Sequence, residues 1–258
     1  MDEYGGFGVV FVAGLGIAVV VAAVIWVMVY AAKLSRERVE ALQRLAAQFD
    51  CRWVGEYPNL NNMFAFFPLF KIGHSRRGYN IAFGNIRLGG IVSETLFGDY
   101  QYKITTSNGK QTTTATFTTS FIITRPRLEV PESLVVRREG FFDKIGEFIG
   151  MDDIDFESSE FSKRFHVKCS DRRFAFDLFD PRMIEYFLED QPPQVEFCEC
   201  VLLATRGTRT WDAAQFVREL KWLDGFYERV PRHVRAARLP EAERATDPIL
   251  NPSSGVSI

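Results

Sequence analysis

Histidine and cysteine are scarce in this sequence, and their scarcity narrows the chemistry open to the protein. Only three histidines and four cysteines occur among the 258 residues. The cysteine spacings fit neither a zinc ribbon nor a redox pair, and the motifs G-x-S-x-G and H-E-x-x-H are missing. The sequence therefore shows no convergent catalytic set, and it predicts no cofactor.

The sequence also lacks a strong excess of either charge. The 31 basic and 33 acidic residues give a formal net charge of −2, which favours no nucleic-acid partner and no acidic substrate. Phenylalanine, in contrast, is abundant at 24 residues, and this supply of apolar side chains indicates a packed globular chain and not a disordered one.

One uncharged run dominates the N-terminal part. It begins at Phe7 and ends at Ala32. As a helix it would cover about 39 Å, more than the roughly 30 Å hydrocarbon core of a bilayer. The alternative is a cleaved secretory signal, but such signals start with basic residues and have a shorter apolar core. We therefore predict a retained transmembrane anchor over residues 1–32, with the lipid bilayer as its partner.

The charges on the two sides of this run predict its orientation. Acidic residues precede it at Asp2 and Glu3, and basic residues follow it at Lys33, Arg36 and Arg38. An excess of Lys and Arg marks the cytoplasmic flank, so the N-terminus is expected outside and the remaining chain in the cytoplasm. Small residues within the run would allow close helix approach and therefore self-association, namely Gly8, Gly14 and Gly16.

The chain after the anchor divides by its patterns. Residues 33–50 place apolar residues near helical period, which predicts an amphipathic juxtamembrane helix. Residues 51–238 show strand patterns first and helical patterns later, which favours a single α+β domain with a mainly antiparallel sheet and with helices concentrated in its C-terminal half. Residues 239–258 are polar and contain proline, so we expect a disordered tail.

Local signals place several elements. The dipeptide Asn108-Gly109 predicts a two-residue hairpin turn in which Ser107 pairs with Lys110. Asp180 followed by Pro181 predicts a helix start, and Thr210 is expected to cap a long amphipathic helix. Further strands are predicted over residues 51–55, 79–86, 134–136, 165–169 and 195–205, and further helices over 139–149 and 171–179.

Several blocks between residues 137 and 188 carry a resemblance. They read "FFDKIG", "DIDFES" followed by "EF", "RFHV" and "DPRM". With the N-terminal anchor and the threonine-rich hairpin, they resemble a family of uncharacterised bacterial membrane-anchored proteins. The resemblance implies a bacterial protein of the inner membrane with one cytoplasmic domain, and it brings no established activity or catalytic residues.

Two groups of side chains are candidate metal ligands. An acidic cluster could bind a hard cation such as Mg²⁺ or Ca²⁺, but it lacks the glycine and spacing of an EF-hand loop, and we interpret it as helix caps and solvated loop; its members are Asp152, Asp153, Asp155, Glu157 and Glu160. Cys198 and Cys200 would project from the same face of one strand and could hold a soft metal, with burial in the core as the alternative.

A basic stripe is a candidate for contact with anionic lipid. Its arginines recur at every third position near the end of the domain, at Arg229, Arg232, Arg235 and Arg238. The alternative is a solvated helix end in which cations favour the helix dipole.

The sequence thus favours a membrane-anchored cytoplasmic interaction or regulatory domain, which binds a protein partner or itself and is not catalytic. Two alternatives stay open. The first is a membrane-tethered metal-dependent hydrolase that uses the 152–160 acidic cluster with His166, and the second is a sensor of anionic lipid surfaces that uses the basic stripe.

Overall fold

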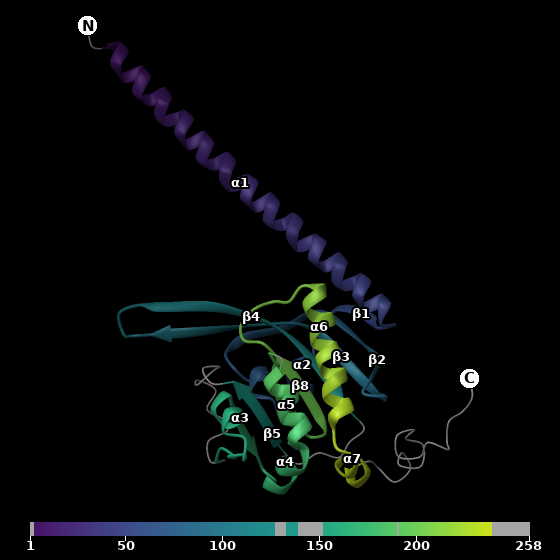
Figure 1. The fold of residues 1–258 in the computed structure, drawn as a ribbon. Helices are drawn as coiled ribbons and strands as arrows, with labels where there is room; N and C mark the ends of the chain where they lie inside the picture. Colours follow the sequence, from purple (N-terminus) through teal and green to yellow (C-terminus); the bar gives the residue numbers. More distant parts are fainter. Residues whose placement is uncertain (1–2, 127–132, 139–151, 190, 239–258) are drawn as a thin grey trace.

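The computed structural model describes residues 3–126, 133–138, 152–189 and 191–238, with side chains from residue 19 to residue 235 (Figure 1). The helix predicted over 139–149 and the tail predicted over 239–258 lie outside the described residues.

A single long helix, α1 (Glu3–Gln48), leads into a mixed body of strands and helices (Figure 1). The first half of the body contains mainly strands: β1 (Arg52–Glu56), α2 (Leu60–Met63), η1 (Pro68–Phe70), β2 (His74–Leu88), β3 (Ile91–Ser107), β4 (Thr112–Arg125) and β5 (Ser133–Arg138). The second half contains α3 (Ser159–Arg164), β6 (Phe165–Cys169), α4 (Arg172–Leu178), α5 (Pro181–Glu189), β7 (Gln194–Cys198), β8 (Val201–Thr205), α6 (Ala213–Arg229) and α7 (Arg232–Arg238).

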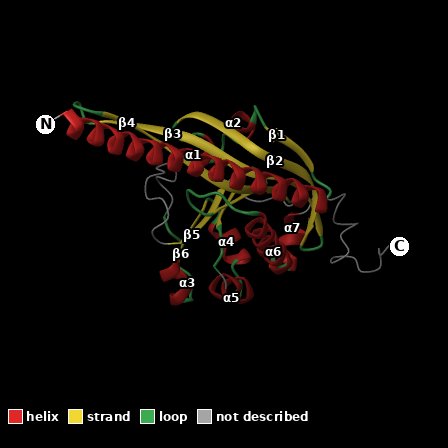
Figure 2. Ribbon diagram, turned by 90° about the horizontal axis from the view of Figure 1, so that it is seen from above, coloured by secondary structure: helices red, strands yellow, loops and turns green. Residues whose placement is uncertain are grey.

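The strands form one eight-stranded antiparallel sheet in the order β1-β2-β3-β4-β8-β7-β5-β6. Helices are concentrated in the C-terminal half, so the predicted α+β class is confirmed. The three longest strands are consecutive, β2 to β4, and the β3–β4 hairpin projects well beyond the body (Figures 1 and 2).

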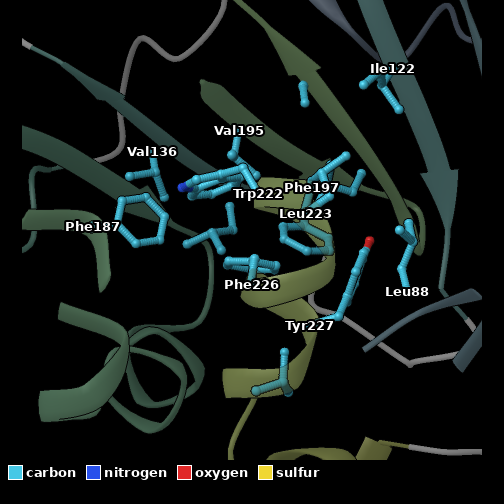
Figure 3. Packing of buried hydrophobic residues seen from close by; sticks show 14 of the residues in the cluster. Leu88, Ile122, Val136, Phe187, Val195, Phe197, Trp222, Leu223, Phe226 and Tyr227 are labelled. Carbon is cyan, nitrogen blue, oxygen red and sulfur yellow. The ribbon is translucent and has the colours of Figure 1, made fainter. Parts of the chain in front are cut away.

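Apolar side chains cover both faces of this sheet because residues alternate between the faces along each strand. The larger core lies between the sheet and helices α4 to α7, and it includes the C-terminal part of α1. Figure 3 shows its centre, where Trp222, Leu223 and Phe226 of α6 face Val195 and Phe197 of β7. A smaller core on the opposite face is covered by α2 and η1.

The helix α1 is continuous, so the predicted anchor and juxtamembrane segments form one element. From Val19 it is long and apolar enough to cross a membrane, and its apolar window is not buried in the fold. Trp26 and Val29 are 67% and 64% exposed. Near Gln48, in contrast, Leu42 and Leu45 are buried in the larger core. The two ends of α1 are therefore suited to different surroundings.

Three local predictions need correction. The β3–β4 turn contains four residues, because Ser107 pairs with Thr112 and not with Lys110. The register consequently moves by two positions, which leaves the same side chains on the same faces. Residues 195–205 form two strands and not one, since Glu199 and Cys200 adopt positive φ and make a tight turn between β7 and β8.

The third correction concerns the start of α6. Its N-cap is Asp212, whose carboxylate accepts from the backbone N–H of Gln215 while the Gln215 side chain accepts from the N–H of Asp212. This reciprocal capping box is stronger than a single threonine cap at position 210. The predicted start at Asp180 is confirmed, since its Oδ1 accepts from the N–H of Met183 at 2.9 Å.

Candidate functional site

A buried ion pair joins α1 to the sheet. The guanidinium of Arg38 donates to both oxygens of Asp99 on β3, from Nη1 at 2.7 Å and from Nη2 at 2.9 Å. Asp99 is fully buried, and its carboxylate also accepts from Asn80 on β2 and Ser120 on β4. Bidentate pairing fixes orientation as well as distance, so the direction of α1 relative to the sheet is determined here.

The same arginine holds the segment before α6. The Nε and Nη2 atoms of Arg38 donate to the carbonyl oxygen of Trp211, at 2.9 and 2.6 Å. The backbone N–H of Trp211 donates to the hydroxyl of Ser120 at 2.7 Å, and that hydroxyl in turn donates to Asp99. One network therefore connects the long helix, three central strand positions and the start of α6.

A groove on the helical side of the body is the strongest candidate for a binding surface. It has a volume of about 750 Å³ and lies over α4, α5 and the segment before α3. We call it the α5 groove, and it is lined by Phe156, Glu157, Ser158, Phe176, Phe179, Pro181, Ile184, Glu185, Leu188 and Glu189. Its floor is apolar, and Phe176 is 46% exposed, which is unusual for a phenylalanine in water.

The charge of the α5 groove has one sign. Glu157, Glu185 and Glu189 line it, all three are exposed, and no basic residue of the described chain is among its lining residues. The guanidinium of Arg172 lies outside the lining, 5.9 Å from the ring of Phe176. Two of the lining residues, Phe156 and Phe179, belong to an aromatic cluster of edge-to-face and tilted rings that also contains Phe161 and Phe187, so the groove has a firm base.

A second groove, of about 550 Å³, lies on the opposite face of the sheet between α2 and strands β2 to β4. Its rim carries Glu94 and Arg125, whose charged atoms are 3.7 Å apart. Because these charges balance each other, this groove selects no partner by charge.

The acidic cluster does not converge on a point. Ile154 and Phe156 point inward, and the N–H of Ile154 donates to the carbonyl of Val167 on β6. The alternate residues therefore lie outward along an extended segment. Asp153 contacts the Nδ1 atom of His166 at 3.0 Å. Within the part of the chain that the structure describes, no three His, Cys, Asp or Glu side chains are close enough to hold a metal ion.

The prediction that Cys198 and Cys200 share one strand face is wrong. Cys198 ends β7, and Cys200 lies in the turn to β8 at a φ of 62°. The four cysteines, all within the described residues, form no disulfide, and Cys51 and Cys169 are buried. Burial, with a smaller contribution from Asp50, raises the pKa of the Cys51 thiol to about 11, so this thiol is not a nucleophile at neutral pH.

The predicted basic stripe is also not a single surface. Helix α6 ends at Arg229 and α7 begins at Arg232, because Pro231 interrupts the helix. Arg235 is only 1% exposed and donates to the carbonyl oxygens of Tyr227 and Gly89. Arg229 stacks over the ring of Tyr186 at 4.0 Å. The side chain of Arg238 lies outside the described residues, and contact of Arg232 with lipid stays a prediction.

Sequence reasoning missed the Arg38–Asp99 pair and the α5 groove. A signal existed for the first, because Asp99 is an acid within an otherwise uncharged part of a strand, between Phe97 and Tyr100. The groove had no such signal, since its walls come from three separate segments.

Comparison with known proteins gives a likeness in fold. No protein-family model matches the chain, and no curated protein matches it in sequence. The fold is similar to that in the crystal structure of the mycobacterial trehalose monomycolate transport factor A, TtfA, with a TM-score of 0.53 over 80% of this chain and 99% of that chain. The two sequences are 11% identical, so the likeness concerns the fold alone. The resemblance to uncharacterised bacterial anchored proteins stays a prediction.

Proposed function

We propose that this protein is a non-catalytic membrane-anchored adaptor, which holds a basic, amphipathic segment of a protein partner in the α5 groove. The observation that carries this proposal is the combination of an exposed apolar floor with exposed glutamates of one sign. A helix or strand with apolar residues on one face and Lys or Arg at its edges complements both features.

The α1 helix supports the anchoring part of the proposal. Its exposed apolar side chains around Trp26 and Tyr30 are followed by the exposed cations Lys33 and Arg36. Aromatic residues gather at membrane interfaces, and Lys and Arg gather on the cytoplasmic side. This order favours a body that lies in the cytoplasm directly below the membrane.

The Arg38–Asp99 junction supports the adaptor part. An anchor that served only as a tether could be joined to the body by a flexible linker. Here the anchor continues into the core and is fixed by a bidentate ion pair, so the body has a defined orientation relative to the axis of the anchor helix. The α5 groove would then be held at a fixed position relative to the anchor helix. A partner that has its own membrane segment requires such a fixed position. The fold neighbour is named as a transport factor.

Site-specific photo-crosslinking in cells tests the proposal. A photoreactive amino acid replaces Phe176 in the full-length protein, and the control carries it at Val92, an exposed apolar residue outside the groove. We expect a crosslinked protein from position 176, and the crosslinked peptide should carry Lys or Arg beside apolar residues. Crosslinks to acidic segments, or equal yields at both positions, would reject the proposed groove.

Charge reversal on the rim of the α5 groove provides a second test of the proposal. The double variant Glu185→Lys, Glu189→Lys should lower the crosslink yield about tenfold or more, because two favourable rim interactions become unfavourable. The matched control is Glu228→Lys, an exposed helical glutamate on α6 away from the groove, which should leave the yield unchanged. A double variant that crosslinks like the control would show that the glutamates do not select the partner.

A further inference from the structure

A small basic pocket lies where β5 ends, β7 begins and β8 ends. It has a volume of about 110 Å³ and is lined by Arg138, Gln191, Pro192, Gln194, Arg206 and Arg209. We call it the arginine pocket. Since one water occupies about 30 Å³ in the liquid, this space suits a group of a few heavy atoms.

The positive charge of the arginine pocket is only partly neutralised. Arg206 donates from Nε to Oε1 of Glu219 at 2.7 Å, and Glu219 is fully buried. In the described part of the chain, the guanidinium groups of Arg138 and Arg209 have no hydrogen-bond or ion-pair partner, and no acidic residue is among the lining residues. Among the described residues, at least two cations of the pocket therefore have no acidic partner.

The guanidinium of Arg206 is held in a fixed position. Besides Glu219, its Nη2 atom donates to the carbonyl oxygen of Gln191. The exposed fraction of the Arg206 side chain is 13%. Its Nε and Nη2 atoms are thus engaged, and Nη1 is the nitrogen that it can offer to an oxyanion, from a position fixed before a ligand arrives.

The loop that carries Arg209 is attached to the junction with α1. The hydroxyl of Thr119 donates to the carbonyl of Gly207 at 2.6 Å, and the N–H of Ser120 donates to the carbonyl of Arg209 at 3.0 Å. Two residues later, the carbonyl of Trp211 accepts from Arg38. In Figure 1 the connection from β8 to α6 lies on the side of the body toward which α1 extends.

The point of attachment on α1 lies close to the uncharged run. Arg38 lies six residues after Ala32, the end of the uncharged run, which corresponds to about 9 Å along a helix. The loop that carries Arg209 is thus attached to the body close to the end of the uncharged run.

We infer that the arginine pocket binds a phosphate group, supplied by an anionic phospholipid headgroup or by a soluble phosphate ester. The guanidinium groups of Arg138 and Arg209 match the oxygen geometry of phosphate. This site shares no residue with the α5 groove or with the basic stripe predicted from the sequence. The inference is therefore independent of the proposed adaptor function.

Thermal unfolding of the full-length protein in a neutral detergent tests the inference. Two probes are titrated at constant ionic strength: inorganic phosphate, and a short-chain phosphatidylglycerol. A ligand that binds only the folded state raises Tm in a saturable way. A response to both probes or to the lipid alone identifies the headgroup as a source, and a response to inorganic phosphate alone identifies a soluble phosphate compound.

Variants decide whether the pocket is responsible. We expect Arg138→Gln and Arg209→Gln each to weaken the apparent affinity about tenfold, because each removes a charge-assisted hydrogen-bond donor. Two matched controls should respond like the wild type: Arg173→Gln, an exposed arginine on α4, and Arg36→Gln, an exposed arginine near the membrane end. No stabilisation by either probe, or an unchanged response of both pocket variants, would overturn the inference. The Glu185→Lys, Glu189→Lys variant should leave this response intact, which separates the two proposals.

Discussion

The Arg38–Asp99 pair predicts a large and specific loss of stability when its cation is removed. In the variant Arg38→Met, the apolar stem of the side chain is retained while the guanidinium is lost. Asp99 then keeps two of its four donated hydrogen bonds, those from Asn80 and Ser120. The carbonyl of Trp211 loses both of its donors from Arg38.

The magnitude follows from burial. Removing one partner of a buried ion pair costs about 3–5 kcal/mol, because the remaining charge is left uncompensated. Asp99 is fully buried, but the Arg38 side chain is 22% exposed, so water can replace part of the lost interaction. We therefore expect the lower end of the range, about 3 kcal/mol, which corresponds to a decrease in Tm of roughly 6–12 °C for a body of this size.

The assay is thermal unfolding of the full-length protein in detergent, with Arg36→Met as the control. Arg36 is an exposed arginine two positions away on the same helix, and its loss should change the free energy of unfolding by less than about 0.5 kcal/mol. The double variant Arg38→Met, Asp99→Asn should be less destabilised than the sum of the single variants. If Arg38→Met and Arg36→Met had equal effects, the ion pair would not be what fixes α1 to the sheet.

Three further predictions concern a buried acid, two turn glycines and the aromatic cluster. Burial raises the pKa of Glu196 from 4.5 to about 7, so the folded state loses stability as pH rises from 4.5 to 7. Glu196→Gln should therefore be more stable than the wild type at pH 8, by about 3 kcal/mol in the free energy of unfolding, and its Tm should be higher there. At pH 4.5 the two proteins should not differ in this way. Gly89→Ala would place a Cβ 2.5 Å from the backbone of Tyr227, whereas Gly109→Ala meets no atom within 4 Å. In chemical denaturation, we expect Gly89→Ala to lower the free energy of unfolding by over about 2 kcal/mol and Gly109→Ala to lower it by about 1 kcal/mol. Phe187→Ala, in the centre of the aromatic cluster, should cost about 3–5 kcal/mol in the same measurement; a loss below 1 kcal/mol would contradict the packing.

The sequence predicted the elements that depend on short-range signals. Asp180 and Pro181 predicted the start of α5, since a cap and the first helical turn lie within four residues of each other. The strand predicted over residues 165–169 coincides with β6. The turn between β7 and β8 was missed because Glu199 and Cys200 are not residues that usually adopt positive φ.

The candidate site was much less predictable. The sequence drew attention to Glu157 through the acidic cluster, but it gave no indication that α4 and α5 would supply an apolar floor beside it. The sequence predicted that Arg235 belongs to an exposed stripe. Because the helix is interrupted at Pro231, the side chain of Arg235 instead points into the core and donates to the carbonyl oxygen of Tyr227. Spacing along the chain cannot reveal which side of a short helix will meet a neighbour.

The sequence alone thus determined the apolar helix, the α+β class and most of the individual strands and helices, because hydrophobic period, capping and turn chemistry act over a few residues. Tertiary structure alone decided what those elements do together. The sheet places β8 beside β4 and β5 between β7 and β6. That order brings Arg138 to Arg206 and Arg209, and it brings Trp211 to the Arg38–Asp99 pair. These contacts join residues up to 173 positions apart, and only the packing of the whole chain could select them.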